Sequence, residues 1–139
     1  MTPRTRRRAY LREAAVMLVV ARFGVRFFAP ARVFAWANRP PRRRRRRRRF
    51  AADEIRWVSW AIDTLGVHPW TRTLCLPRAL AAQAMLRRRG IASRLCLGVK
   101  RSDGAVDAHA WLEIGGDKIV GGAEAAEFTP LAAFGGADR

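Results

Sequence analysis

The sequence predicts an α+β fold in which helices come first and a small antiparallel sheet follows. Apolar residues recur at helical spacing within residues 10–37, 53–65 and 75–89, whereas from residue 95 onward the apolar period drops to two. The chain of 139 residues has the usual length of one domain. We expect a helical, apolar, Arg-rich N-terminal arm and linker over residues 1–50 and the folded domain over residues 51–139.

Positive charge is concentrated in the first part of the chain. Lys plus Arg number 28 against 11 acidic residues, a formal net charge of +17. Much of it lies in the cluster Arg4, Arg6, Arg7 and Arg8 and in the uninterrupted run Arg42 to Arg49. Such a charge favours nucleic acid, anionic lipid or an acidic peptide as partner. No stacking aromatics or groove-reading helix accompany the run, which argues against nucleic acid and favours a solvated linker.

The apolar part of the arm, residues 10–37, predicts one or two helices with a break at Pro30. Its longest uncharged piece, residues 14–21, is far shorter than the roughly 20 residues that a bilayer span requires. Three placements stay open for this segment: packing on the domain, lying on a membrane surface, or docking a partner protein.

Two further helices are expected before the sheet. An amphipathic period over residues 53–65 predicts the first, and Gly66 ends it. The second runs from Cys75 to Arg89, with Pro77 tolerated in its first turn. Apolar side chains spread around most of the circumference of this second helix, so we expect it to be largely buried.

Alternating apolar residues predict three strands of an antiparallel sheet. The first covers residues 94–99, and the loop 101–105 then turns the chain. The second strand covers residues 108–114, and Gly115-Gly116 is a two-residue hairpin turn into the third, residues 117–120. Odd-numbered side chains of the second strand share one face, which places His109 beside Trp111.

The cysteine and histidine content excludes some classes of site. Two cysteines, Cys75 and Cys96, are too few for a disulfide framework, and without a signal peptide the sequence indicates a reducing cytoplasm. Two histidines and no CxxC or HExxH spacing predict no metal site, and no cofactor is expected. Cys96 lies in the middle of a strand and is interpreted as packing, and His68, before Pro69, as structural or solvent-facing.

Cys75 and His109 are the candidate catalytic residues. A cysteine at a helix N-terminus feels the positive end of the helix dipole, which favours thiolate, and Arg78 adds charge of the same sign. A histidine on a strand packed against that helix can accept a proton and return it to a leaving group. The backbone N–H of Cys75 is a candidate oxyanion donor. Taken singly, each residue is also compatible with a structural role.

Four motifs follow one another along the chain: Cys75-Leu-Pro-Arg-Ala-Leu, Leu86-Arg-Arg-Arg-Gly90-Ile, Leu97-Gly98-Val99 and His109-Ala-Trp-Leu-Glu113. Their order and spacing match those of a known family. Over roughly residues 51–122 this combination resembles the transglutaminase-like, papain-type leader peptidases of lasso-peptide biosynthesis, the stand-alone protease half of the split B protein. The N-terminal arm is similar only in its apolar, Arg-rich character.

The resemblance implies a cysteine peptidase domain over residues 51–139, with Cys75 as nucleophile and His109 as acid and base. Its implied substrate is the leader of a ribosomally made precursor peptide. The implied partners are a small leader-binding protein and an ATP-dependent macrolactam cyclase. Two alternatives stay open: a transglutaminase-type acyl transferase, and a basic adaptor without chemistry that binds nucleic acid or membrane. The expected location is cytoplasmic, with peripheral membrane contact left open.

One position departs from the family. Members usually carry an Asp about a dozen residues after the His, which orients the imidazole, and here that position is Gly121. The expected hairpin sets His109 opposite Gly122, with Gly121 beside it. Three outcomes stay open: a Cys-His dyad, an impaired site, or orientation by another acid such as Glu124 or Asp107.

Overall fold

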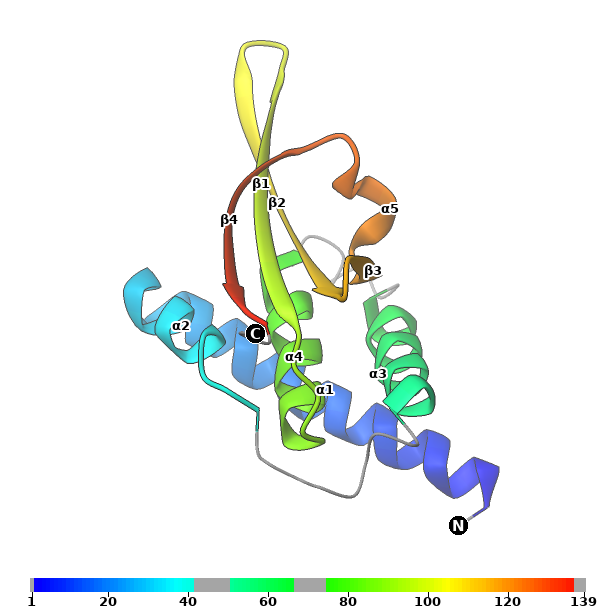
Figure 1. The fold of residues 1–139 in the computed structure, drawn as a ribbon. Coiled ribbons are helices and arrows are strands. Elements are labelled where there is room, and N and C mark those ends of the chain that lie inside the picture. Colours follow the sequence, from blue (N-terminus) through cyan, green and yellow to red (C-terminus); the bar gives the residue numbers. More distant parts are fainter. Residues whose placement is uncertain (1, 42–50, 67–74, 137–139) are drawn as a thin grey trace.

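The computed structural model describes residues 2–41, 51–66 and 75–136. Its elements follow one another as α1 (Pro3–Phe27), α2 (Pro30–Ala37), α3 (Ala51–Gly66), α4 (Cys75–Arg88), β1 (Arg94–Ser102), β2 (Ala105–Ile114), β3 (Asp117–Val120), α5 (Gly122–Ala125) and β4 (Thr129–Gly135). Figure 1 shows α3 and α4 between α1 and the sheet. The α+β architecture, helices followed by an antiparallel sheet, is confirmed.

Helix α1 is longer than expected because it begins at Pro3 rather than at residue 10. The Thr2 side chain caps it by accepting a hydrogen bond from the backbone N–H of Thr5, and Pro3 fits the first turn. The helix ends at the extended residue Phe28. Pro30 then starts α2, so the predicted break is confirmed.

One side of α1 packs on the rest of the protein. Tyr10, Ala14 and Leu18, each four residues apart, are buried against α3 and α4. Helix α4 is buried around most of its circumference, as predicted, since every residue from Ala79 to Leu86 is buried. The core therefore lies around α4, between α1 on one side and the sheet on the other.

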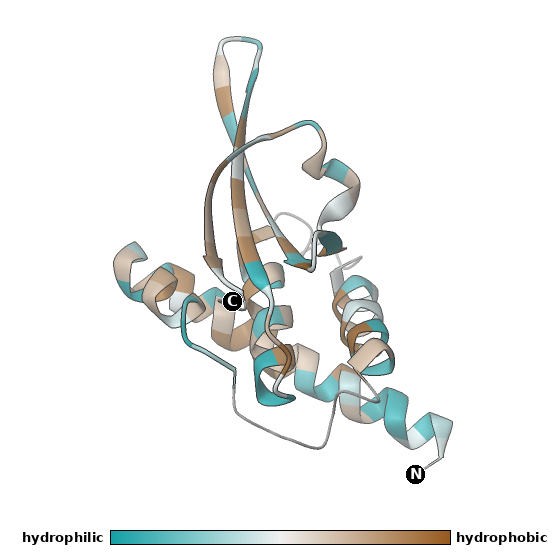
Figure 2. Ribbon diagram, viewed as in Figure 1, coloured by the Kyte–Doolittle hydropathy of each residue, from teal (hydrophilic) through white to brown (hydrophobic). Residues whose placement is uncertain are grey.

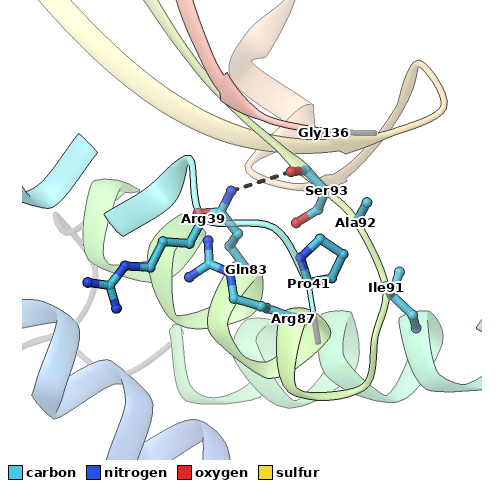
Figure 3. Close-up of a pocket in the computed structure, with 8 residues that line it drawn as sticks. All are labelled: Arg39, Pro41, Gln83, Arg87, Ile91, Ala92, Ser93 and Gly136. Carbon is cyan, nitrogen blue, oxygen red and sulfur yellow. Dashed lines mark hydrogen bonds between the residues drawn. The ribbon is translucent and has the colours of Figure 1, made fainter. Parts of the chain in front are cut away.

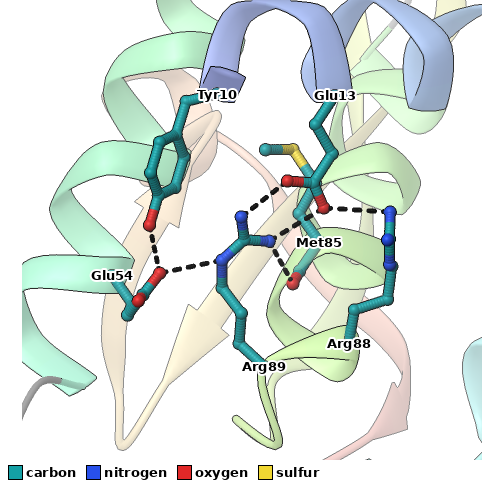
Figure 4. Close-up of polar contacts among 6 residues, drawn as sticks. All are labelled: Tyr10, Glu13, Glu54, Met85, Arg88 and Arg89. Carbon is teal, nitrogen blue, oxygen red and sulfur yellow. Dashed lines mark hydrogen bonds and ion pairs between the residues drawn. The ribbon is translucent and has the colours of Figure 1, made fainter. Parts of the chain in front are cut away.

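A polar network ties α1, α3 and α4 together at Arg89, just after α4 (Figure 4). The Arg89 guanidinium donates to both carboxylate oxygens of Glu13, at 2.9 and 2.6 Å, and to a carboxylate oxygen of Glu54 at 2.8 Å. It also donates to the Met85 carbonyl at 2.9 Å, and the Tyr10 hydroxyl donates to Glu54. Burial disfavours the charge, but the bonds to Glu13 outweigh it and raise the pKa of Arg89.

The sheet has the strand order β3-β2-β1-β4, with antiparallel pairing throughout. The expected loop 101–105 is wrong in extent: β1 runs to Ser102 and β2 starts at Ala105. Between them Asp103 and Gly104 both have positive φ, 49° and 78°, which is the conformation of a tight hairpin turn. β4, which no sequence pattern indicated, pairs with β1 on the side away from β2.

The register of the β2–β3 hairpin is partly as expected. Ile114 pairs with Asp117 across the Gly115-Gly116 turn, as predicted. An irregularity between Leu112 and Glu113 then shifts the ladder, which ends where Leu112 pairs with Val120. The expectation that His109 faces Gly122 is therefore wrong. The strand partner of His109 is Gly98 on β1.

Gln83 joins α4 to the end of α2 and to Ser93, the residue just before β1 (Figure 3). Its amide nitrogen donates to the Ala37 carbonyl at 3.1 Å and to the Ser93 carbonyl at 3.4 Å. Gly135 packs so closely here that a Cβ atom would lie 2.9 Å from each of these three groups. The hollow beside Gln83 has a volume of about 10 Å³, room for about one water molecule. The hollow is therefore too small for a ligand.

Candidate active site

Cys75 is the first residue of α4, at the helix N-terminus where the sequence placed it. Its half-buried side chain packs against the main core cluster. Arg78, one turn on, donates to Asp63 of α3 at 3.1 Å, so its charge is shared with a carboxylate. The positive end of the α4 dipole and the N–H groups of its first turn are thus the main local polar features beside the thiol. Residues 67–74, which include His68, lie outside the described residues.

His109 lies on β2 in an enclosed setting, with only 8% of its side chain exposed. The Phe128 ring lies 5.0 Å from it between centroids, and the Trp111 ring 6.0 Å. Trp111 is itself fixed, because its indole N–H donates to Glu113 at 2.8 Å. These contacts hold the imidazole in one orientation.

A backbone carbonyl supplies the hydrogen bond that orients the ring. Nε2 of His109 lies 2.9 Å from the carbonyl oxygen of Gly121. A carbonyl oxygen can only accept, so Nε2 carries the hydrogen and donates it. In the neutral ring Nδ1 is then left with a free lone pair. The position where the resemblance led us to expect an Asp side chain contributes its main-chain oxygen instead.

The geometry at Gly121 explains why its oxygen can point at the ring. Gly121 has a φ of +73°, which a glycine adopts readily, and it turns the chain out of β3 into α5. A Cβ atom built there would lie 3.3 Å from Nε2 of His109 and 3.0 Å from the Ala110 carbonyl. A side chain at this position would therefore meet both backbone strain and crowding.

Of the two acids considered as substitutes, only Glu124 approaches the ring. Its carboxylate lies 3.9 Å from Nδ1 of His109, an ion pair when the imidazole is protonated. With 72% of its side chain exposed, Glu124 stabilises the imidazolium weakly. Asp107 is exposed on β2 opposite Lys100, and no hydrogen bond or ion pair links it to His109 among the residues described.

Helix α4 packs against β2, the strand that carries His109. The core between them is built on the sheet face of Ala110 and Leu112, whereas His109 and Trp111 occupy the alternate positions. Within the described ranges no hydrogen bond joins the Cys75 thiol to the imidazole. The pairing of Cys75 with His109 stays a prediction.

Cys96 is a buried packing residue on β1, as the sequence suggested. It pairs with Trp111 across the strands and belongs to a small cluster with Ala125. Burial and the neighbouring Glu113 carboxylate raise the pKa of Cys96 to about 11. Near neutral pH this thiol is therefore almost entirely protonated and unreactive.

We expect iodoacetamide near neutral pH to alkylate Cys75 in the folded protein while Cys96 stays unmodified. A thiol with a pKa of about 11 is thiolate in only about one molecule in 10⁴ at pH 7, and it becomes reactive only as the pH rises toward that value. Peptide mass spectrometry of the alkylated protein measures both sites. Unfolding in denaturant should expose both thiols. Equal labelling of the two cysteines in the folded state would contradict this account.

No metal centre is indicated in the described part of the chain, where no three His, Cys, Asp or Glu side chains gather in a way that could hold an ion.

A protein-family model described as the transglutaminase-like superfamily matches residues 15–133 of the chain. The matched range contains both Cys75 and His109 and extends from α1 into β4. No curated protein and no solved structure matches the chain.

Proposed function

The chain belongs to the transglutaminase-like superfamily, and we propose that it is a cysteine peptidase that removes the leader from a lasso-peptide precursor. Superfamily membership implies Cys- and His-catalysed acyl transfer or peptide hydrolysis. The observation that best supports a working site is the enclosed His109, whose Nε2 donates to the Gly121 carbonyl and whose Nδ1 is thereby free to take a proton. The choice of a lasso leader as substrate rests on the motif resemblance.

In the proposed first step, the Cys75 thiolate attacks the carbonyl carbon at the junction of leader and core. The backbone N–H of Cys75 lies at the start of α4, where helical N–H groups have no partner within the helix, and we propose that it stabilises the oxyanion. The C–N bond breaks as the imidazolium of His109 gives its Nδ1 proton to the departing core amine. The leader is left as a thioester on Cys75.

In the second step, water hydrolyses the thioester. Nδ1 of neutral His109 takes a proton from the attacking water, and the C–S bond breaks to release the leader carboxylate and restore the thiolate. The Gly121 carbonyl keeps the ring in the required tautomer through both steps, while Glu124 is placed to stabilise the imidazolium. Among the described residues the carboxylate that pairs with the ring is this exposed one, so the proposed site has less electrostatic support than a buried Asp would supply.

The proposed partners are the precursor peptide, a small leader-binding protein and a macrolactam cyclase. The protein is proposed to act in the cytoplasm. The described residues form one helical layer and one sheet without a separate peptide-binding module, which supports delegation of leader recognition to a partner.

Hydrolysis and acyl transfer share the thioester, so the products decide between them. We expect the full chain, incubated with precursor, leader-binding protein and an excess of a primary amine, to release a leader that ends in a free carboxylate. Intact-mass spectrometry distinguishes this leader from its amide. A leader bearing the amine would identify an acyl transferase instead. An uncleaved precursor, in the presence of a partner shown to bind the leader, would contradict the proposal.

A further inference from the structure

The side of α1 that faces away from the core carries an exposed apolar stripe. Val16, Val20, Phe23 and Phe27 follow one another at spacings of three or four residues, and their side chains are 58%, 59%, 56% and 70% exposed. Phe28, in the short connection between α1 and α2, is 55% exposed. In Figure 2 apolar colours gather on α2 and the adjoining part of α1, whereas the N-terminal part of α1 is hydrophilic.

An apolar groove continues this stripe between α1 and α2. It has a volume of about 710 Å³, and Leu80, Ala81 and Ala84 of α4 are among the residues that line it. Its other lining residues come from α1, from α2, from the connection between these helices and from Arg39 just after α2, and most are apolar. Large apolar surfaces of this kind on a folded protein usually mark an interaction site.

The charge in the part of the sequence that forms this surface has a single sign. The sequence has no Asp or Glu from residue 14 to residue 52, but it has twelve arginines there. Arg22 and Arg26 lie on α1 beside the stripe, and Arg32 and Arg39 line the groove. The last acid before this stretch, Glu13, is already bound to Arg89. A ligand of this surface must therefore combine an apolar part with diffuse negative charge.

We infer that the face formed by α1 and α2 binds the surface of an anionic lipid bilayer. Exposed Phe and Val side chains would enter the acyl boundary, and the flanking arginines would contact lipid phosphates, with their aliphatic stems along the apolar surface. No helix in the described part of the chain is long and apolar enough to cross a bilayer, so α1 lies in the interface plane. A protein partner would place individual acids opposite individual arginines, whereas an anionic membrane matches a surface of uniform sign.

This inference does not depend on the peptidase activity. The stripe lies on the opposite side of α1 from Tyr10, Ala14 and Leu18, and none of its residues touches the candidate site. It would hold the enzyme at the membrane while α4 and the sheet stay in water.

The test is co-sedimentation of the full chain with vesicles of phosphatidylcholine alone or mixed with phosphatidylglycerol. We expect binding to the mixed vesicles, little binding to pure phosphatidylcholine, and weaker binding as salt rises. Phe23→Ser combined with Phe27→Ser should lower the partition coefficient at least about tenfold, because two apolar side chains are withheld from the acyl boundary. The matched control is Val106→Ser with Leu131→Ser, which changes two residues exposed to a similar degree on the sheet.

Several outcomes would overturn the inference. Unchanged binding by the Phe23/Phe27 variant would show that the arginine run alone binds lipid. Absence of binding to any vesicle would also overturn it. If the added leader-binding protein in addition shields Phe23 and Phe27 from solvent in a footprinting experiment, the face is assigned to a protein partner. Circular dichroism should show both double variants folded, and both should still cleave precursor in solution.

Discussion

Replacing Cys75 by alanine should abolish leader removal, lowering the cleavage rate by about a thousandfold or more. The substitution removes the only atom that can form the proposed thioester, and the remaining site offers no second nucleophile, since Cys96 is buried with a pKa raised to about 11. Cleavage of the precursor with its leader-binding partner, followed by mass spectrometry of the products over time, measures the loss.

The matched control is Cys96→Ala, which removes the other thiol from the buried cluster with Trp111. It should cleave at nearly the wild-type rate once folding is verified. His109→Ala should also lose most activity, because in the proposed mechanism the imidazole protonates the departing amine and then takes a proton from water. Undiminished cleavage by Cys75→Ala would overturn the proposed mechanism. If only Cys96→Ala lost cleavage activity, the nucleophile would be Cys96 on β1.

The sequence predicted the position of each candidate residue but not what orients the histidine. The apolar helical pattern with Pro77 in its first turn placed Cys75 at the start of α4, and a period of two placed His109 beside Trp111. The bond to Gly121 depends on a ladder irregularity at Leu112 and on a left-handed turn at the end of β3. Side-chain patterns carry no information about where a main-chain oxygen points, so only three-dimensional structure could find this acceptor.

The elements of the fold also differ in whether local sequence determines them. Turns and helix ends are local, and the breaks at Pro30 and at Gly115-Gly116 were predicted correctly. β4 depends on pairing with β1, whose paired residues lie 30 to 41 positions earlier in the chain, and most residues of β4 are exposed. Its sequence therefore has little of the apolar alternation that reveals a half-buried strand.

Helix α1 packs on the domain, one of the three placements that the sequence left open, and also presents an exposed side. One side of it, with Tyr10 and Leu18, packs on the domain. Another side, with Val20 and Phe23, is exposed and flanked by arginines. An apolar run with little amphipathic contrast could not show which residues face the core, because both sides of the helix are apolar.

Replacing Arg89 by alanine should destabilise the fold by about 3–5 kcal/mol, the cost typical of leaving buried charges unpaired. Its side chain is 13% exposed, and it binds the carboxylates of Glu13 and Glu54, which are 17% and 12% exposed. The variant leaves two acids from α1 and α3 close together without their shared cation. Denaturant unfolding followed by circular dichroism measures the change, provided that the transition is two-state.

Arg88→Ala is the matched control, since Arg88 is the neighbouring residue and also binds Glu13, at 3.2 Å, but with 57% of its side chain exposed. A solvent-exposed pair of this kind contributes at most about 1 kcal/mol, so this variant should unfold close to the wild-type midpoint. If the two variants lose equal stability, the Arg89 network is not what fixes α1 to α3 and α4. If Arg89→Ala is too unstable to purify, Arg89→Met, which keeps most of the apolar volume, still tests the loss of charge. Combining it with Glu13→Gln should recover part of the loss, because it removes one of the two carboxylates that Arg89 binds in the wild type.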